Sequence, residues 1–122
     1  MATILLADDD AAVRDLVRRA LSADGHTVHV TQDGLEALDC LGTNLASIDV
    51  LVTDVDMPQL DGISLAEKAL HMKPAIAVVL MSGFSDQLER AGRLRVRKLL
   101  SVSKPFTLEQ IKQEGRFVFQ RN

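Results

Sequence analysis

Aromatic residues and cysteine are scarce in this chain of 122 residues. It contains four Phe, no Trp and no Tyr, so its hydrophobic core must consist mainly of Val, Ile, Leu, Ala and Met. The single cysteine, Cys40, cannot form an internal disulfide, and it lies among leucines at helical spacing. This position favours a small, half-buried hydrophobic residue over a reactive thiol.

Long hydrophobic runs and an excess of positive charge are also absent. The apolar run at the N-terminus stops at Asp8, so it is too short for a signal peptide or a membrane-spanning helix. It also has no basic residue before it, as a signal peptide would. The net charge of -3 and the pI of about 5.5 provide no positive field for nucleic acid. We therefore expect a cytoplasmic protein whose partners include neither a membrane nor a nucleic acid.

The chain does contain enough apolar material for a packed core. Hydrophobic residues make up 47% of it, and the mean hydropathy is +0.09, which excludes the disordered class. We find no linker, repeat or low-complexity stretch, and the length is typical of one domain. Residues 1–122 are therefore expected to form a single domain with no output domain after it.

Five short segments have the pattern of β-strands. Residues 4–7, 50–52, 75–81 and 99–102 are predominantly apolar runs, several of them rich in β-branched residues. Such runs are typical of parallel strands that are buried on both faces. Residues 27–30 alternate between polar and apolar, which predicts a strand at the edge of the sheet.

Helical periodicity fills the segments between these strands. The first helix contains apolar residues at i, i+3, i+4, i+7 and i+8 from Val13 and should end near Gly25. The second should be closed by Gly42, and the third must end before Pro74. A short fourth helix is expected around residues 85–92, and a capping box at 107–110 predicts a fifth. Five alternating strands and helices indicate an α/β fold with a parallel sheet covered on both faces.

Polar residues follow the strands at their carboxyl ends, which meet at one edge of such a sheet. These residues are Asp8, Asp9, Asp10, Asp54, Asp56, Ser82 and Lys104. Crowded carboxylates repel one another, and a hard divalent cation with oxygen ligands relieves the repulsion. We therefore expect Mg²⁺ at this edge. Asp54 lies flush with a strand end, so it has a fixed backbone and can serve as a nucleophile toward phosphorus.

Each of these signals also has a simpler interpretation. An acidic triplet after a strand commonly caps the next helix, and Asp10 fits that role. The pairs Ser82-Gly83 and Lys104-Pro105 are typical of turns and loops. Because all of them fall at the ends of successive strands, the combination favours a functional site.

The chain resembles the response-regulator receiver family, the fold of the chemotaxis protein CheY, over essentially its whole length. The matching stretches are residues 4–10, 54–62, 81–83 and 103–106. The resemblance implies a doubly wound, flavodoxin-like (βα)5 sheet with the strand order 2-1-3-4-5. It also implies a phosphoacceptor switch, which catalyses only its own phosphotransfer and autodephosphorylation and is not otherwise an enzyme.

The resemblance further implies which residues bind the metal ion. Asp9 would be the main metal-binding carboxylate, and Asp8 would hold Mg²⁺ through water. Asp54 and the main-chain carbonyl of Asp56 would complete the protein ligands.

The same resemblance implies how the phosphoryl group is held and who supplies it. Asp54 would be the phosphoacceptor, Ser82 would form a hydrogen bond to the phosphoryl group, and Lys104 would pair with its oxygens. A histidine kinase or histidine phosphotransferase would donate the group, and a downstream protein target would bind the phosphorylated state. Residues 81–84 and 99–107 also resemble the CpdR-type regulators of the ClpXP protease, which implies a target of the protease-adaptor type.

Two features depart from the family pattern or stand outside it. Receivers often carry an aromatic residue where this chain has Ser101, so a switch based on an aromatic rotamer is excluded. Residues 90–98 carry five cations and no acid. This basic segment is either a solvated face or a docking patch for an acidic partner.

Two alternatives to a stand-alone receiver are open. Residues 54–56 also resemble the nucleophile and acid of haloacid-dehalogenase phosphatases, although that motif normally follows the first strand of the core and here follows the third. Alternatively, the chain is a receiver excised from a multidomain regulator.

Overall fold

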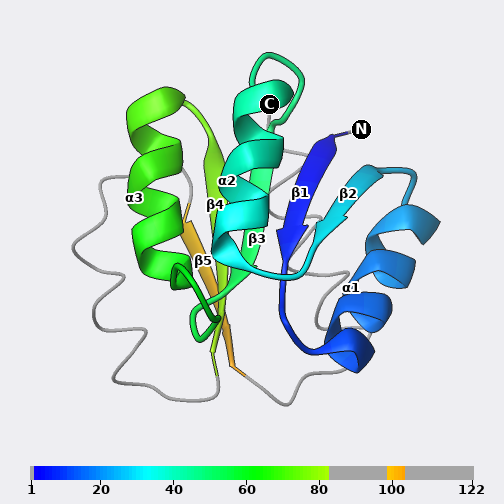
Figure 1. The fold of residues 1–122 in the computed structure, drawn as a ribbon. Coiled ribbons are helices and arrows are strands. Elements are labelled where there is room, and N and C mark those ends of the chain that lie inside the picture. Colours follow the sequence, from blue (N-terminus) through cyan, green and yellow to red (C-terminus); the bar gives the residue numbers. More distant parts are fainter. Residues whose placement is uncertain (1, 83–98, 104–122) are drawn as a thin grey trace.

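The structure is a computed structural model that describes residues 2–82 and 99–103. The described strands form one parallel sheet in the order β2-β1-β3-β4-β5, which confirms the predicted topology (Figure 1). They are β1 (Thr3–Ala7), β2 (Thr27–Thr31), β3 (Val50–Asp54), β4 (Ala77–Ser82) and β5 (Leu99–Ser103). As expected from its alternating pattern, β2 is an edge strand.

Three helices in the described residues connect these strands: α1 (Ala11–Ala23), α2 (Gly34–Thr43) and α3 (Gly62–Met72). An aspartate side chain caps each of them by accepting a hydrogen bond from a backbone N–H of the first turn. The capping residues are Asp10, Asp33 and Asp61. Each cap contributes about 1 kcal/mol to helix stability. The predicted fourth and fifth helices, the basic segment 90–98 and Lys104 lie outside the described residues.

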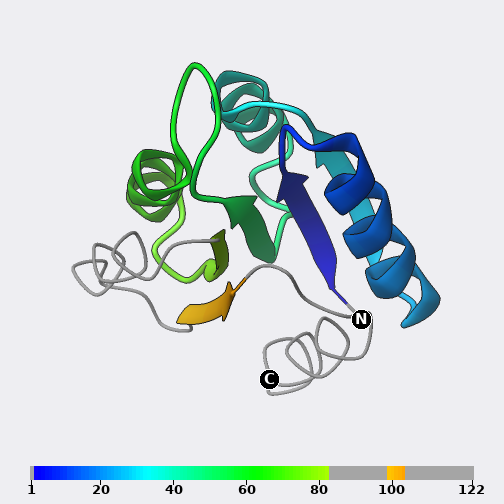
Figure 2. The ribbon, with the colours of Figure 1, turned by 90° about the horizontal axis from the view of Figure 1, so that it is seen from below.

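The helices cover both faces of the sheet, as Figure 2 shows. On one face, Val17, Ala20 and Leu21 of α1 pack against the sheet in one apolar cluster that includes Leu6. On the other face, α2 and α3 bury their apolar residues in a second cluster that includes Leu5. Neighbouring residues of β1 therefore pack into opposite cores, and this explains why the strand is apolar from Ile4 to Ala7.

The helix ends agree with the sequence in part. Gly25 adopts a positive φ of 92° just after α1, and α3 ends at Met72, before Pro74. The expected closure of α2 at Gly42 is wrong, because the helix continues to Thr43. Asn44 is the C-cap instead, and its side-chain Nδ2 donates to the carbonyl of Cys40 at 2.9 Å.

A lysine joins two loops at the sheet edge opposite to the polar residues. The Lys73 Nζ atom donates hydrogen bonds to the carbonyl oxygens of Leu45 at 3.0 Å and Ile48 at 2.6 Å. It thus ties the end of α3 to the segment that leads into β3.

No helix among residues 2–82 and 99–103 is long and apolar enough to cross a membrane.

Candidate functional site

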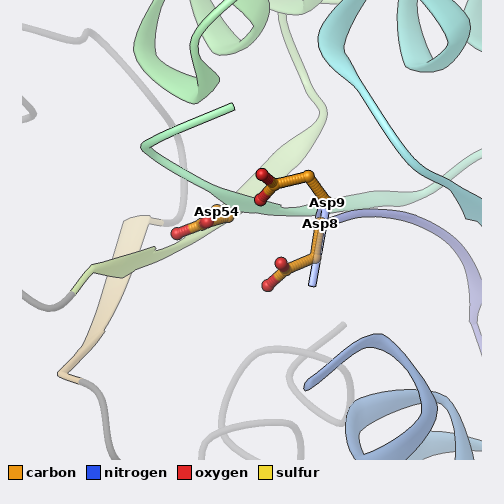
Figure 3. Close-up of side chains that lie close together, drawn as sticks. All are labelled: Asp8, Asp9 and Asp54. Carbon is orange, nitrogen blue, oxygen red and sulfur yellow. The ribbon is translucent and has the colours of Figure 1, made fainter. Parts of the chain in front are cut away.

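Three carboxylates meet beyond the carboxyl ends of β1 and β3. Asp8 and Asp9 directly follow β1, and Asp54 is the last residue of β3. Their carboxylate oxygens lie within 4.8 Å of one another, and the side chains turn into the same space (Figure 3). Asp8 and Asp54 are 0% and 6% exposed, whereas Asp9 is exposed. The structure therefore brings together three of the residues that the sequence predicted for this site.

Asp8 is held by hydrogen bonds at both polar groups of its backbone and at its side chain. Its N–H donates to the carbonyl of Thr31 at 3.2 Å, and its Oδ1 accepts from the N–H of Asp10 at 2.9 Å. Its carbonyl oxygen accepts from Nη1 of Arg14 at 2.9 Å. These bonds fix the start of the β1–α1 loop, and no local sequence pattern predicts the bond from Arg14.

Two hydrogen bonds and a close backbone approach fix the backbone around Asp54. The Thr53 hydroxyl donates to the Asp54 carbonyl at 2.9 Å, and the Val55 N–H donates to the Met81 carbonyl at 3.0 Å. A β carbon on Gly62 would lie 2.0 Å from the Asp54 carbonyl oxygen, closer than real atoms approach. Only glycine allows α3 to begin this close to the end of β3.

The β3–α3 loop that follows Asp54 is packed against α2. A β carbon on Gly34, the first residue of α2, would lie 2.0 Å from the Leu60 carbonyl oxygen. Within the same loop, Gln59 has a φ of 74°, a conformation that costs a residue with a side chain about 1 kcal/mol. Asp56, whose carbonyl was predicted to bind the metal ion, has an exposed side chain. No local sequence pattern predicts the structural roles of these two glycines.

One other predicted residue, Ser82, belongs to a neighbouring strand, and Lys104 lies outside the described residues. Met81 of β4 is the register partner of Asp54, and Ser82 ends that strand one residue farther on. Ser82 in turn pairs with Ser103 of β5, and Lys104 directly follows Ser103 in the sequence. The strand register therefore places Ser82 at the same sheet edge as the three carboxylates.

The chemistry of the carboxylate cluster suits a hard divalent cation. Asp8, Asp9 and Asp54 offer oxygen donors only, which match Mg²⁺ rather than a softer metal ion. Two of the three are buried, so their like charges repel with little screening by water. A cation among them would remove that repulsion.

Cys40 and His26 have shifted pKa values but lie away from this cluster. Burial raises the pKa of the Cys40 thiol, which disfavours the reactive thiolate and agrees with the predicted half-buried hydrophobic residue. Burial also lowers the pKa of His26, whose Nδ1 accepts a hydrogen bond from the Ala2 N–H at 3.0 Å.

Comparison with known proteins identifies the family of this arrangement. The family model described as response regulator receiver domain matches residues 4–116. The response regulator MprA of Mycobacterium sp. (strain KMS) is 35% identical over 118 residues, which are 97% of this chain and 50% of that protein. MprA of Mycobacterium bovis (strain BCG / Pasteur 1173P2) is 34% identical over the same length. The chain thus spans about half the length of the curated relatives that it matches.

Solved structures give the same result. A response regulator receiver domain protein from Clostridium thermocellum is similar with a TM-score of 0.86 and 27% identity, covering 99% of this chain and 96% of that one. The receiver domain of the hybrid histidine kinase CckA is similar with a TM-score of 0.82 and 29% identity, covering 98% and 100%. These comparisons do not favour the haloacid-dehalogenase alternative. The chain belongs to the response regulator receiver family.

Proposed function

We propose that this receiver accepts a phosphoryl group on Asp54 and signals by a change in its affinity for a protein partner. The observation that carries the proposal is the position of Asp54, buried at the end of β3 with its carboxylate within 4.8 Å of two further acids. Receiver domains are in general phosphoacceptor switches, and the family implies histidine kinases or phosphotransferases as donors.

The transfer itself requires one nucleophile and one leaving group. A carboxylate oxygen of Asp54 attacks the phosphorus of a phosphohistidine, and a P–O bond forms as the P–N bond breaks. The histidine ring leaves with the electron pair and takes a proton from solvent. Little further chemistry is needed, because positioning and charge neutralisation dominate phosphoryl transfer.

Mg²⁺ fits the donor set of the site. Asp8, Asp9 and Asp54 would hold it together with the carbonyl of Asp56, and receiver domains generally bind Mg²⁺ at an acidic pocket. When bound, the ion neutralises negative charge on the carboxylates and the incoming phosphoryl group. The protein's own part is to keep three acids close together and to fix the backbone that carries them.

The remaining roles complete the proposal. Ser82 would donate a hydrogen bond to the phosphoryl group and Lys104 would pair with its oxygens, since Ser82 ends β4 and Lys104 directly follows the last residue of β5 in the sequence. Charge-assisted bonds of this kind favour whichever conformation brings the donors closest, so phosphorylation shifts a population. The downstream target is a protein, with a protease adaptor as the specific candidate. Residues 1–122 act as one receiver domain in this scheme.

Labelling by a small phosphodonor tests the assignment. The protein is incubated with acetyl phosphate and Mg²⁺, and intact mass spectrometry should find one added phosphate that peptide mapping places on Asp54. Asp54→Ala should carry none, whereas Asp39→Asn, which changes an exposed acid on α2, should be labelled like the wild type.

Two results would overturn the proposal. One is a phosphate that is still incorporated by Asp54→Ala, which would move the acceptor to another residue. The other is multiple turnover of an external phosphomonoester, which would support the phosphatase alternative.

A further inference from the structure

Arg14 occupies an unfavourable place for a cation. It is the fourth residue of α1, at the end of the helix where the dipole is positive, and the acid at that end, Asp10, is bonded to the backbone N–H groups of Ala12 and Val13. Arg18 and Arg19 on the same helix pair with Asp15, but no salt bridge of the described residues includes Arg14. The reason for a cation at this position therefore lies outside the helix.

The partner of Arg14 is a main-chain atom at the carboxylate cluster. Its Nη1 donates to the carbonyl oxygen of Asp8 at 2.9 Å, in a partly buried position. This carbonyl belongs to the peptide group that joins Asp8 to Asp9. Because a peptide group is planar and rigid, a bond to its oxygen also fixes the direction in which Asp9 leaves it.

Asp9 depends on this bond more than the other two acids do. Asp54 is buried and is the last residue of a central strand, and Asp8 is buried and bonded through its N–H and its carboxylate. Asp9 is exposed, and no hydrogen bond between described residues holds its side chain. Rotation of the Asp8–Asp9 peptide would move the Asp9 carboxylate away from the cluster without disturbing β1.

We propose that Arg14 is a positioning residue, which holds the Asp8–Asp9 peptide so that the Asp9 carboxylate faces Asp8 and Asp54. This inference rests on the proposed function of the cluster as a Mg²⁺ site. It assigns Arg14 no contact with the metal ion or the phosphoryl group. The residue acts through the backbone of the β1–α1 loop.

The sign of the effect on Mg²⁺ affinity distinguishes positioning from simple electrostatics. If Arg14 acted only as a nearby positive charge, its removal would strengthen cation binding, because a repulsive charge would be lost. If it positions Asp9, its removal weakens binding. Loss of a residue that orients a metal ligand typically costs 10-fold to 100-fold in affinity, about 1.4 to 2.7 kcal/mol.

The experiment is a double-mutant cycle measured by calorimetric titration with MgCl₂. Arg14→Met, which keeps the length of the side chain and removes its donors, should weaken Mg²⁺ binding about 10-fold or more. Arg18→Met is the matched control on the same helix and should bind like the wild type. In an Asp9→Asn background, Arg14→Met should have little further effect, because the ligand that it positions is already lost.

A second readout uses the metal-free protein. The N–H of Asp10 is bonded to Oδ1 of Asp8, so a loosened loop should expose it. Hydrogen exchange followed by NMR should be faster for this amide in Arg14→Met and unchanged in Arg18→Met. Should Arg14→Met fail to fold, Arg14→Gln replaces it, with the same expected direction in both measurements.

Failure of this inference is distinct from failure of the proposed function. If the wild type does not bind Mg²⁺, the proposed function fails and takes this inference with it. If the wild type binds Mg²⁺ and Asp9→Asn weakens binding, but Arg14→Met binds equally well or more tightly, the positioning role is overturned. Equal losses from Arg14→Met in the wild-type and Asp9→Asn backgrounds would likewise overturn it.

Discussion

At the scale of single residues, the negative charges that the carboxylate cluster offers to a cation also repel one another and lower the stability of the metal-free protein. Asp8 and Asp54 are buried next to each other, and Asp9 adds a third negative charge to the same space. Such an arrangement favours a functional role for the cluster, because neutral residues at the same positions would repel less.

Removal of one acid should therefore stabilise the metal-free protein. We expect Asp54→Ala to raise the free energy of unfolding by about 1 kcal/mol. Urea unfolding in the presence of a chelator measures the change. The control Asp39→Asn, an exposed acid on α2, should change it by less than about 0.5 kcal/mol. A destabilised Asp54→Ala would show that the interactions of this carboxylate outweigh its repulsion.

His26 should make stability depend on pH in a narrow window. Burial, together with the nearby N-terminal charge, lowers its pKa in the folded state below the ordinary value of 6.5. The unfolded chain then binds the proton more readily, so stability is lost as the pH falls from 6.5 toward the lower folded pKa. His26→Asn retains an acceptor for the Ala2 N–H without titrating there.

Unfolding free energies measured between about pH 5 and 8 check this prediction. The wild type should lose more stability on acidification than His26→Asn does. The surface variant His71→Asn serves as the control and should retain the wild-type slope. Identical slopes for the wild type and His26→Asn would refute the role of His26.

At the scale of elements, close backbone approaches decide which glycines are required. Gly34 begins α2 against the Leu60 carbonyl, whereas Gly42 near the end of the same helix has no atom closer than Cε of Met72 at 3.8 Å. The two positions lie on one helix and differ only in their surroundings. They form a natural pair for comparison.

Alanine should have opposite effects at these two positions. Gly34→Ala forces the β3–α3 loop away from α2 and should cost about 1 to 3 kcal/mol. Gly42→Ala should stabilise by about 0.5 to 1 kcal/mol, because alanine has the better helix propensity and no neighbour is displaced. Thermal and urea unfolding of the two variants measure both signs. The same sign in both would contradict the contact-based argument.

Local pattern predicted the elements well and the contacts between them poorly. The apolar periodicity of α1 and the continuous apolar run of β3 predicted both elements, since each pattern arises within one segment. The end of α2 was missed because Gly42 looks like a helix terminator but keeps an ordinary φ. The bonds of Lys73 to the loop before β3 left no signal, because they join segments that are distant in the sequence.

The residues of the candidate site also include some that the sequence predicts and some that it does not. Asp8, Asp9 and Asp54 could be predicted to meet because topology alone brings the ends of parallel strands together. Arg14, Thr31 and Gly62 could not, since their roles depend on the distances between particular backbone atoms. A rule about strand ends therefore finds the clustered acids but not the backbone contacts around them.

At the scale of the whole molecule, binding of a cation should be visible as stability. A ligand that binds only the native state adds about 2.7 kcal/mol at a hundred times its dissociation constant. The melting temperature should therefore rise with MgCl₂, and Asp9→Asn should remove most of the rise. Asp39→Asn should respond like the wild type. An unchanged response in Asp9→Asn would show that the ion binds elsewhere.

Because Gly62 lies against the Asp54 carbonyl, substitutions at these two positions should impair the protein in a cell in different ways. If Asp54 is the phosphoacceptor, as proposed, its substitution should leave the fold intact, and a folded receiver that cannot be phosphorylated would persist and compete with the native protein for its phosphodonor. A side chain at position 62 instead pushes the end of β3 and α3 apart and reduces the amount of folded protein. When a variant is present together with the native protein, substitutions of Asp54 should therefore be dominant and substitutions of Gly62 recessive.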